Sequence, residues 1–149
     1  MAANLRRSFQ PEKEAIGGFV DRVAFDMAKK KQPKFLERWQ IERIEQVAMD
    51  AIGKWQWLTF GYYMDDYNHL RMIMPVSFGV LPNGVRAVLG FEPNDPSRDR
   101  PLNRYMLYDT SGMDSVATMP MPFDASKLPD VPGGDPFKET LMRIGPRVQ

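Results

Sequence analysis

Two arginines stand within otherwise apolar and aromatic stretches and are the side chains best suited to binding chemistry. Arg71 opens the stretch 71–75 and Arg104 opens the stretch 104–109. A planar guanidinium donates two parallel hydrogen bonds to a carboxylate or a phosphate. We therefore expect both arginines to lie on adjacent strands, to point the same way and to hold an anionic group. Asp109 is the internal competitor for that role, and the alternative is that each arginine faces solvent or pairs within the protein.

Aromatic side chains lie close to Arg71 in the sequence, as in sites where bases stack beside a cation in single-stranded nucleic acid complexes. The same aromatic residues would also suit a small hydrophobic core. Tyr62 and Tyr63 are consecutive and cannot share one face of a strand, so at least one of them is a candidate for exposure. The candidate ligand-binding residues are Arg71, Arg104, Tyr62, Tyr63, His69 and Asp109.

Catalytic, metal and cofactor signatures are not found in the sequence. His69 is the sole histidine, there is no cysteine, and one histidine beside Asp65 and Asp66 makes an incomplete metal site. No serine lies in a nucleophile-elbow pattern, and neither Gly-Gly pair has the spacing of a phosphate-binding loop. We therefore expect a protein that binds rather than catalyses, without metal or cofactor.

Length and charge set further bounds. A chain of 149 residues suits one domain. It shows neither a signal-peptide pattern nor an apolar run of about 20 residues, so a cytoplasmic protein that does not engage a membrane is expected. Residues 1–38 hold nine Lys/Arg against five Asp/Glu, a balance of +4, and the remaining residues balance to −3. A basic arm of this kind indicates either an anionic partner or a solvated helix face.

Two amphipathic helices are predicted at the start of the chain. Apolar residues recur at helical spacing from Ile16 to Met27, and Pro33 ends that helix. A second helix is predicted over 34–52, with Glu45 on its polar side and Gly53 after its end. Both helices, together with the proline-rich tail after residue 120, could contact a partner protein or a second copy of the chain.

After Gly53 the periodicity changes to that of strands. Asn83-Gly84 is a strong hairpin signal, and prolines recur from Pro120 to Pro136, where an extended tail is expected, with at most a short helix over 137–144. The fold class predicted is α+β: two N-terminal helices, a small antiparallel five-stranded SH3-like or Sm-like barrel and a Pro-rich tail. The corresponding segments are 1–53, 54–123 and 124–149, with strands at 55–63, 70–74, 85–91, 104–109 and 115–119.

The strand region resembles a WYL domain over residues 45–123. The resemblance is carried by Leu58-Thr59-Phe60-Gly61-Tyr62, by the Arg-x-x-x-Pro stretch 71–75, by the hairpin at Asn83-Gly84 and by the strand that begins at Arg104. The Trp-Tyr-Leu tripeptide of that family is Ala87-Val88-Leu89 here, so ligand identity does not carry over. The resemblance implies an Sm-like barrel that senses a nucleic acid or a nucleotide-like ligand in a regulatory protein.

Two functions follow from these observations. The first is a non-catalytic WYL-like regulatory module that binds a nucleic acid or nucleotide-like anion. The second is a structural or interaction protein, such as an assembly subunit or an inhibitor of a host machine, without a small-molecule ligand. Convergence of Arg71 and Arg104 on one concave face would favour the first function, and an apolar patch elsewhere would favour the second. Several of the eleven methionines are expected either to fill the core or to form an adaptable contact surface.

Overall fold

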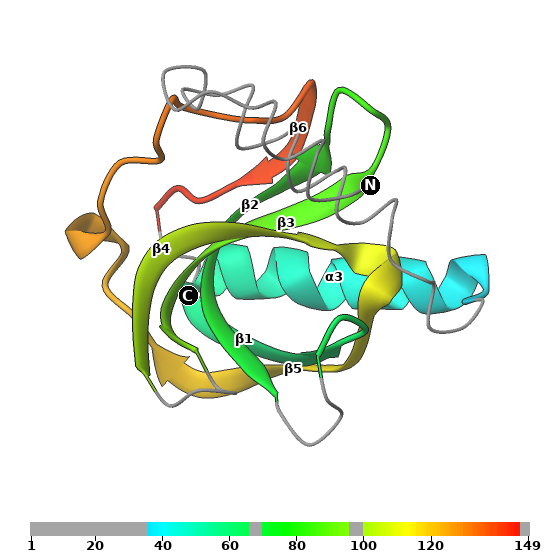
Figure 1. The fold of residues 1–149 in the computed structure, drawn as a ribbon, viewed down its shortest axis with the longest axis horizontal. Coiled ribbons are helices and arrows are strands. Elements are labelled where there is room, and N and C mark those ends of the chain that lie inside the picture. Colours follow the sequence, from blue (N-terminus) through cyan, green and yellow to red (C-terminus); the bar gives the residue numbers. More distant parts are fainter. Residues whose placement is uncertain (1–35, 66–69, 96–99, 147–149) are drawn as a thin grey trace, which may run out of the picture.

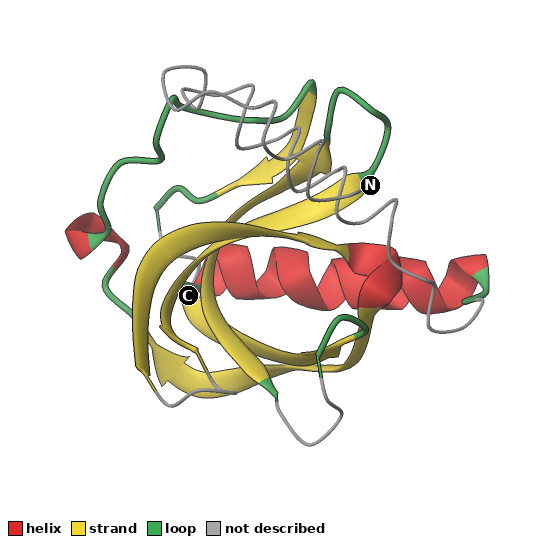
Figure 2. Cartoon of the chain, viewed as in Figure 1, coloured by secondary structure: helices red, strands yellow, loops and turns green. Residues whose placement is uncertain are grey.

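The computed structural model describes residues 36–65, 70–95 and 100–146. These residues form one α-helix and a six-stranded antiparallel sheet (Figures 1 and 2). The elements are α3 (Arg38–Lys54), β1 (Gln56–Tyr62), β2 (Arg71–Val80), β3 (Arg86–Asp95), β4 (Arg100–Asp109), β5 (Met113–Pro122) and β6 (Glu139–Arg143), with 3-10 turns η2 (Thr110–Gly112) and η3 (Ala125–Lys127).

The helix α3 is positioned by small side chains on one of its faces. Ala48 and Ala51 are fully buried and let the helix approach the sheet closely, and the helix, with Ile52 also fully buried, packs on β1, β2 and β5. At its start, the Gln40 side chain accepts a hydrogen bond from the Glu37 backbone N–H. At its end, Trp55 adopts a left-handed conformation with φ 56°, which turns the chain into β1.

The sheet has the strand order β4-β3-β2-β1-β5, and β6 pairs with β2 outside that order. One edge of β2 is shared: residues 71–73 pair with β1, and residues 77–80 pair with β6. Pro75 lies within β2 rather than at its end. A register shift between Pro75 and Ser77 accommodates the proline, because a bulge does not require its missing N–H.

Two clusters of buried side chains lie on opposite faces of the sheet. The first joins α3 to inward residues of β1 and β2, such as Leu58, Phe60 and Ile73. The second lies on the other face of β3 and β4, where Leu89 and Leu107 pack beneath residues 123–146, here called the C-terminal segment. The C-terminal segment is tied down by hydrogen bonds from the Lys138 and Ile144 backbone N–H groups to carbonyls of β2, at 2.8 and 2.7 Å.

The predicted fold class is wrong. Instead of two N-terminal helices, a five-stranded barrel and an extended tail, the described residues form one helix and six strands. The first predicted helix, which includes Ile16 to Met27 and ends at Pro33, lies outside the described residues. The short helix expected over 137–144 is instead β6, because the free half of the β2 edge offers backbone hydrogen bonds that local sequence does not reveal.

Candidate functional site

Arg71 opens β2 and is surrounded by its own chain's acidic and phenolic groups. Its Nε and Nη2 donate to the two carboxylate oxygens of Asp65, at 2.7 and 2.8 Å. Its Nη1 donates to both oxygens of Glu92 at 3.1 Å and approaches the Tyr108 hydroxyl at 3.2 Å. The Tyr108 hydroxyl also donates to Glu92. Arg71 therefore already makes the forked contacts that were expected for an external anion.

Electrostatics in this cluster favour internal pairing. Burial raises the pKa of Glu92, although the hydrogen bond from Tyr108 and the charge of Arg71 oppose that rise. Burial also raises the pKa of the Tyr108 hydroxyl, so it stays protonated. For Arg71, burial disfavours the cation, but Asp65, Tyr108 and Glu92 outweigh it and raise its pKa. With both carboxylates ionised the cluster carries a net charge of −1, which would repel an additional anion.

Arg104 does not join Arg71. It lies on β4, exposed, and β3 separates its strand from β2, so the prediction of adjacent strands is wrong. The strand register places Arg104 opposite Glu92, on the same face of the β3–β4 ladder. The expected competitor, Asp109, instead accepts hydrogen bonds from the Ser111 backbone N–H and hydroxyl, at 2.9 and 2.8 Å, and begins the 3-10 turn η2.

The remaining candidate ligand-binding residues are Tyr62, Tyr63 and His69. Tyr62 is 7% exposed, and its hydroxyl accepts a hydrogen bond from the Asp109 backbone N–H at 3.0 Å. Burial raises its pKa well above the ordinary value. Tyr63 is half-buried, and its ring lies 5.0 Å from that of Tyr62 in an edge-on arrangement. His69 lies outside the described residues.

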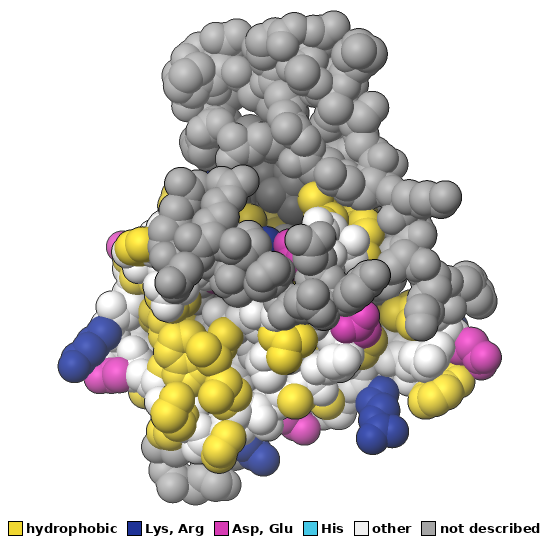
Figure 3. All heavy atoms as spheres, turned by 60° about the horizontal axis from the view of Figure 1, so that its bottom comes forward, with side chains coloured by type: hydrophobic (Ala, Val, Ile, Leu, Met, Phe, Trp, Pro, Cys, Tyr) yellow, Lys and Arg dark blue, Asp and Glu magenta, His cyan; other side chains and the backbone are white. Residues whose placement is uncertain are grey.

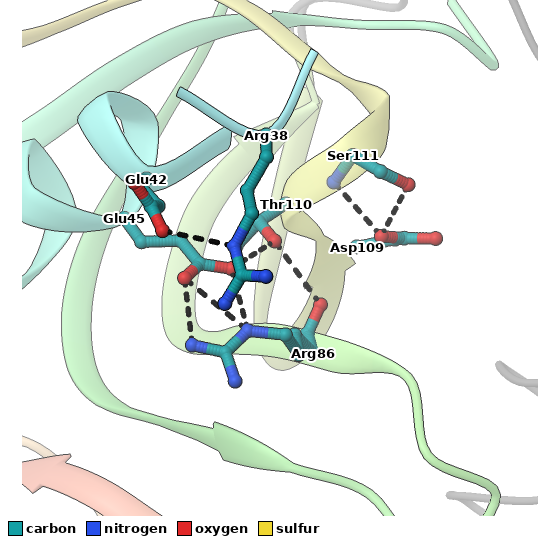
Figure 4. A network of polar contacts seen from close by, with 7 residues as sticks. All are labelled: Arg38, Glu42, Glu45, Arg86, Asp109, Thr110 and Ser111. Atoms are coloured by element: carbon teal, nitrogen blue, oxygen red, sulfur yellow. Dashed lines mark hydrogen bonds and ion pairs between the residues drawn. The ribbon is translucent and has the colours of Figure 1, made fainter. Parts of the chain in front are cut away.

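A second ion pair, between buried Glu45 and partly exposed Arg86, connects α3 to the sheet (Figure 4). Glu45 accepts from the Arg86 Nε and Nη2, at 2.9 and 2.8 Å, and from the Thr110 hydroxyl at 2.8 Å. Glu45 is 4% exposed, so its expected place on the polar side of the helix is wrong. The hydrogen bonds from Arg86 and Thr110 permit a carboxylate at this buried position. The burial of Glu45 could have been predicted from its spacing of three residues from Ala48, which lies on the buried face of the helix.

A cleft of about 520 Å³ lies between the C-terminal segment and the sheet. Val76 and Leu89 contribute to its apolar lining from the sheet, and Leu128 and Val131 do so from the C-terminal segment. Its polar lining comes from Ser77, Tyr105, Asp130, Asp135 and Arg143. This volume falls within the range of small-molecule sites.

Methionines gather on the outward face of β2, β1 and β5, on the opposite side of these strands from Leu58 and Ile73. Met72 lies opposite Thr59, which in turn lies opposite Ala117. Met72 and Met121 are 40% and 54% exposed. Figure 3, which brings β1 and β5 forward, shows hydrophobic side chains gathered into a patch. We call this surface the methionine face; its residues are Trp57, Thr59, Met72, Met74, Ala117, Met119 and Met121.

Within the described ranges, no three or more His, Cys, Asp or Glu side chains are grouped so as to hold a metal ion. None of the helices in the described part of the chain is long and apolar enough to span a membrane.

Comparison with known proteins gives only distant structural similarity. No family model matches the sequence, and no curated protein is significantly similar to it. A solved structure of proteasome accessory factor B/C (PafBC) of Arthrobacter aurescens is similar, with a TM-score of 0.40 and 19% sequence identity. The similarity covers 88% of this chain and only 21% of that chain. A likeness at this level does not establish a shared fold or function, and membership of the WYL family remains a prediction from the sequence.

Proposed function

We propose that this chain is a non-catalytic interaction module of the cytoplasm, which binds another protein chain through the methionine face. The observation that carries the proposal is the exposure of Met72 and Met121 on one apolar sheet face. Soluble proteins rarely leave large apolar patches uncovered, and flexible methionine side chains suit adaptable contacts.

The two halves of the outward sheet surface differ in a way that supports this proposal. Over β3 and β4, the C-terminal segment covers the apolar residues, and Leu89 and Leu107 are 1% and 2% exposed. On the methionine face, in contrast, Met72 of β2 and Met121 of β5 remain 40% and 54% exposed. A partner surface would cover the methionine face, as the C-terminal segment covers the apolar residues of β3 and β4.

A second copy of the same chain is the partner that these features favour. The residues of the methionine face carry no charge, so two identical faces meet without repulsion in a twofold arrangement. The formal net charge of the chain is only +1, so long-range repulsion between copies is weak as well.

Self-association is expected to depend on concentration and to be lost when the methionine face is charged. Met72→Glu and Met121→Glu should each weaken the dimer at least about 10-fold, because a twofold interface would bury each carboxylate in both copies. Sedimentation velocity over a wide concentration range measures the effect. Met64→Glu is the matched control, since Met64 is 38% exposed in the turn after β1. A wild-type chain that stays monomeric throughout would refute self-association.

A nucleic acid or nucleotide-like ligand is the second candidate, as the WYL resemblance implies. The exposed guanidinium of Arg104 favours it, whereas Arg71 is already paired. If a phosphate binds at Arg104, affinity for single-stranded DNA or RNA should fall steeply with salt, and Arg104→Ala should weaken binding by about 1–3 kcal/mol. Fluorescence anisotropy at two salt concentrations tests this, with Arg38→Ala as the control. Equal binding by wild type and both variants would reject Arg104 as the contact.

A further inference from the structure

The cleft beneath the C-terminal segment is lined by a buried hydroxyl that has no hydrogen-bond partner in the described part of the chain. Ser77 lies in β2 and is 6% exposed, and its hydroxyl makes no hydrogen bond with the described residues. Ser77 lies opposite both Leu89 and Arg143 in the ladders on its two sides, so its side chain shares their face and lines the cleft. A buried polar group left unpaired by the protein is a common sign of a bound molecule, because such groups are otherwise satisfied.

The apolar walls of the cleft favour a ligand that is largely apolar. Val76, Leu89 and Val131 line it, and the volume of about 520 Å³ is sufficient for a small organic molecule rather than a protein segment. The Tyr105 hydroxyl does not compete for such a ligand, because it donates to the Pro129 carbonyl at 2.6 Å. That bond also links the C-terminal segment to β4.

The net charge of the cleft lining favours a cationic ligand. Arg143 is already paired with Asp135 at 2.6 Å, and Asp135 also accepts from the Thr140 hydroxyl and the Phe137 backbone N–H. Burial disfavours ionised Asp135, but these hydrogen bonds lower its pKa and keep it charged. Asp130 is exposed and has no ion-pair partner among the described residues. The lining therefore carries two negative charges and one positive charge, a balance of −1.

We propose that this cleft binds a small amine with an apolar body, whose ammonium group pairs with Asp130 while Ser77 hydrogen-bonds to the same molecule. This inference does not depend on the methionine face, because the residues that line the cleft are not residues of that face. It assigns the chain a small-molecule site in addition to its protein contact.

Three probes with similar bodies and different charges test the proposal. Isothermal titration calorimetry on the full chain would compare 2-phenylethylamine with 2-phenylethanol and 3-phenylpropionate at millimolar concentration. The amine should bind most tightly and raise the melting temperature. Equal binding of amine and alcohol, tighter binding of the carboxylate, or no binding of any probe would each overturn the proposal.

Two substitutions locate the contacts. Asp130→Asn should weaken amine binding about 2- to 5-fold, the range for an exposed ion pair, and leave alcohol binding unchanged. Ser77→Val should weaken binding about 2- to 10-fold, the contribution of one hydrogen bond, and circular dichroism would establish that this variant folds. Asp50→Asn on α3 is the control and should bind like wild type. Unchanged binding by Asp130→Asn would overturn the assignment even if Ser77→Val failed to fold.

Discussion

Replacing Arg71 with methionine is expected to lower the free energy of unfolding by about 3–5 kcal/mol at neutral pH. The substitution leaves Asp65 and Glu92, whose side chains are 11% and 0% exposed, without a cation between them. Urea denaturation followed by tryptophan fluorescence and circular dichroism measures the loss. Arg104→Met is the matched control, because that arginine is exposed on β4, and it should change stability by no more than about 0.5 kcal/mol.

The deficit of Arg71→Met should shrink in acid. Loss of the cation raises the folded-state pKa of Glu92 further above its unfolded value, where burial already places it. A carboxyl group with a raised folded pKa contributes stability that is present below its unfolded pKa and is lost as pH rises through the folded pKa. The variant should therefore approach wild type as pH falls from 7 toward the ordinary glutamate range.

Glu92→Gln separates the charge from the packing. It removes one of the two negative charges, retains an oxygen for Arg71 and Tyr108, and brings the net charge of the cluster to zero. We expect it to change the free energy of unfolding by within about 1 kcal/mol and to recover part of the loss when combined with Arg71→Met. If Arg71→Met were as stable as wild type at neutral pH, the internal ion pairs would not be structural, and Arg71 would again be a ligand candidate.

Arg86→Met is expected to cost about 2–3 kcal/mol, less than Arg71→Met. It leaves Glu45, with a side chain only 5% exposed, supported by the Thr110 hydroxyl alone. The expected loss is smaller because the Arg86 side chain is 47% exposed, so solvent already weakens the pair. Urea denaturation at neutral pH measures the cost.

Arg38→Met is the control for Arg86→Met. Arg38 pairs with Glu42 one helical turn away on α3, and its side chain is 91% exposed (Figure 4). Such a pair contributes no more than about 0.5 kcal/mol. Equal effects of the two substitutions would show that the link from Glu45 to Arg86 does not hold α3 on the sheet.

Local patterns in the sequence identified several elements closely. The helical spacing predicted 34–52, and α3 is Arg38–Lys54; the alternation over 55–63 corresponds to β1 (Gln56–Tyr62). The Asn83-Gly84 signal is also correct: Gly84 has a φ of 89° in the turn between β2 and β3, a backbone conformation that glycine adopts readily. These elements depend on near neighbours in the chain, which a single sequence displays.

The features that were missed depend on distant pairing. Arg71 meets Glu92, 21 residues away, only because the β2–β3 register brings them together. The hydrogen-bond partners of buried Glu45 are Arg86 and Thr110, which lie 41 and 65 residues away. The strand β6 forms because β1 pairs only with residues 71–73 of β2, which leaves the same edge of residues 77–80 available for pairing. None of these partners leaves a periodic signal in the sequence, so the internal anions of Arg71 and the sixth strand could not be predicted.

The shared edge of β2 also bears on the order of folding. The strands β2, β3 and β4 follow one another along the chain and pair as neighbours, so their contacts close short loops. In contrast, β1 pairs with β5 and β2 pairs with β6 only after long loops close, at a greater entropic cost. We therefore expect the meander β2-β3-β4 to form first during folding. The five residues of β6 should join last and, in native-state hydrogen exchange, open first.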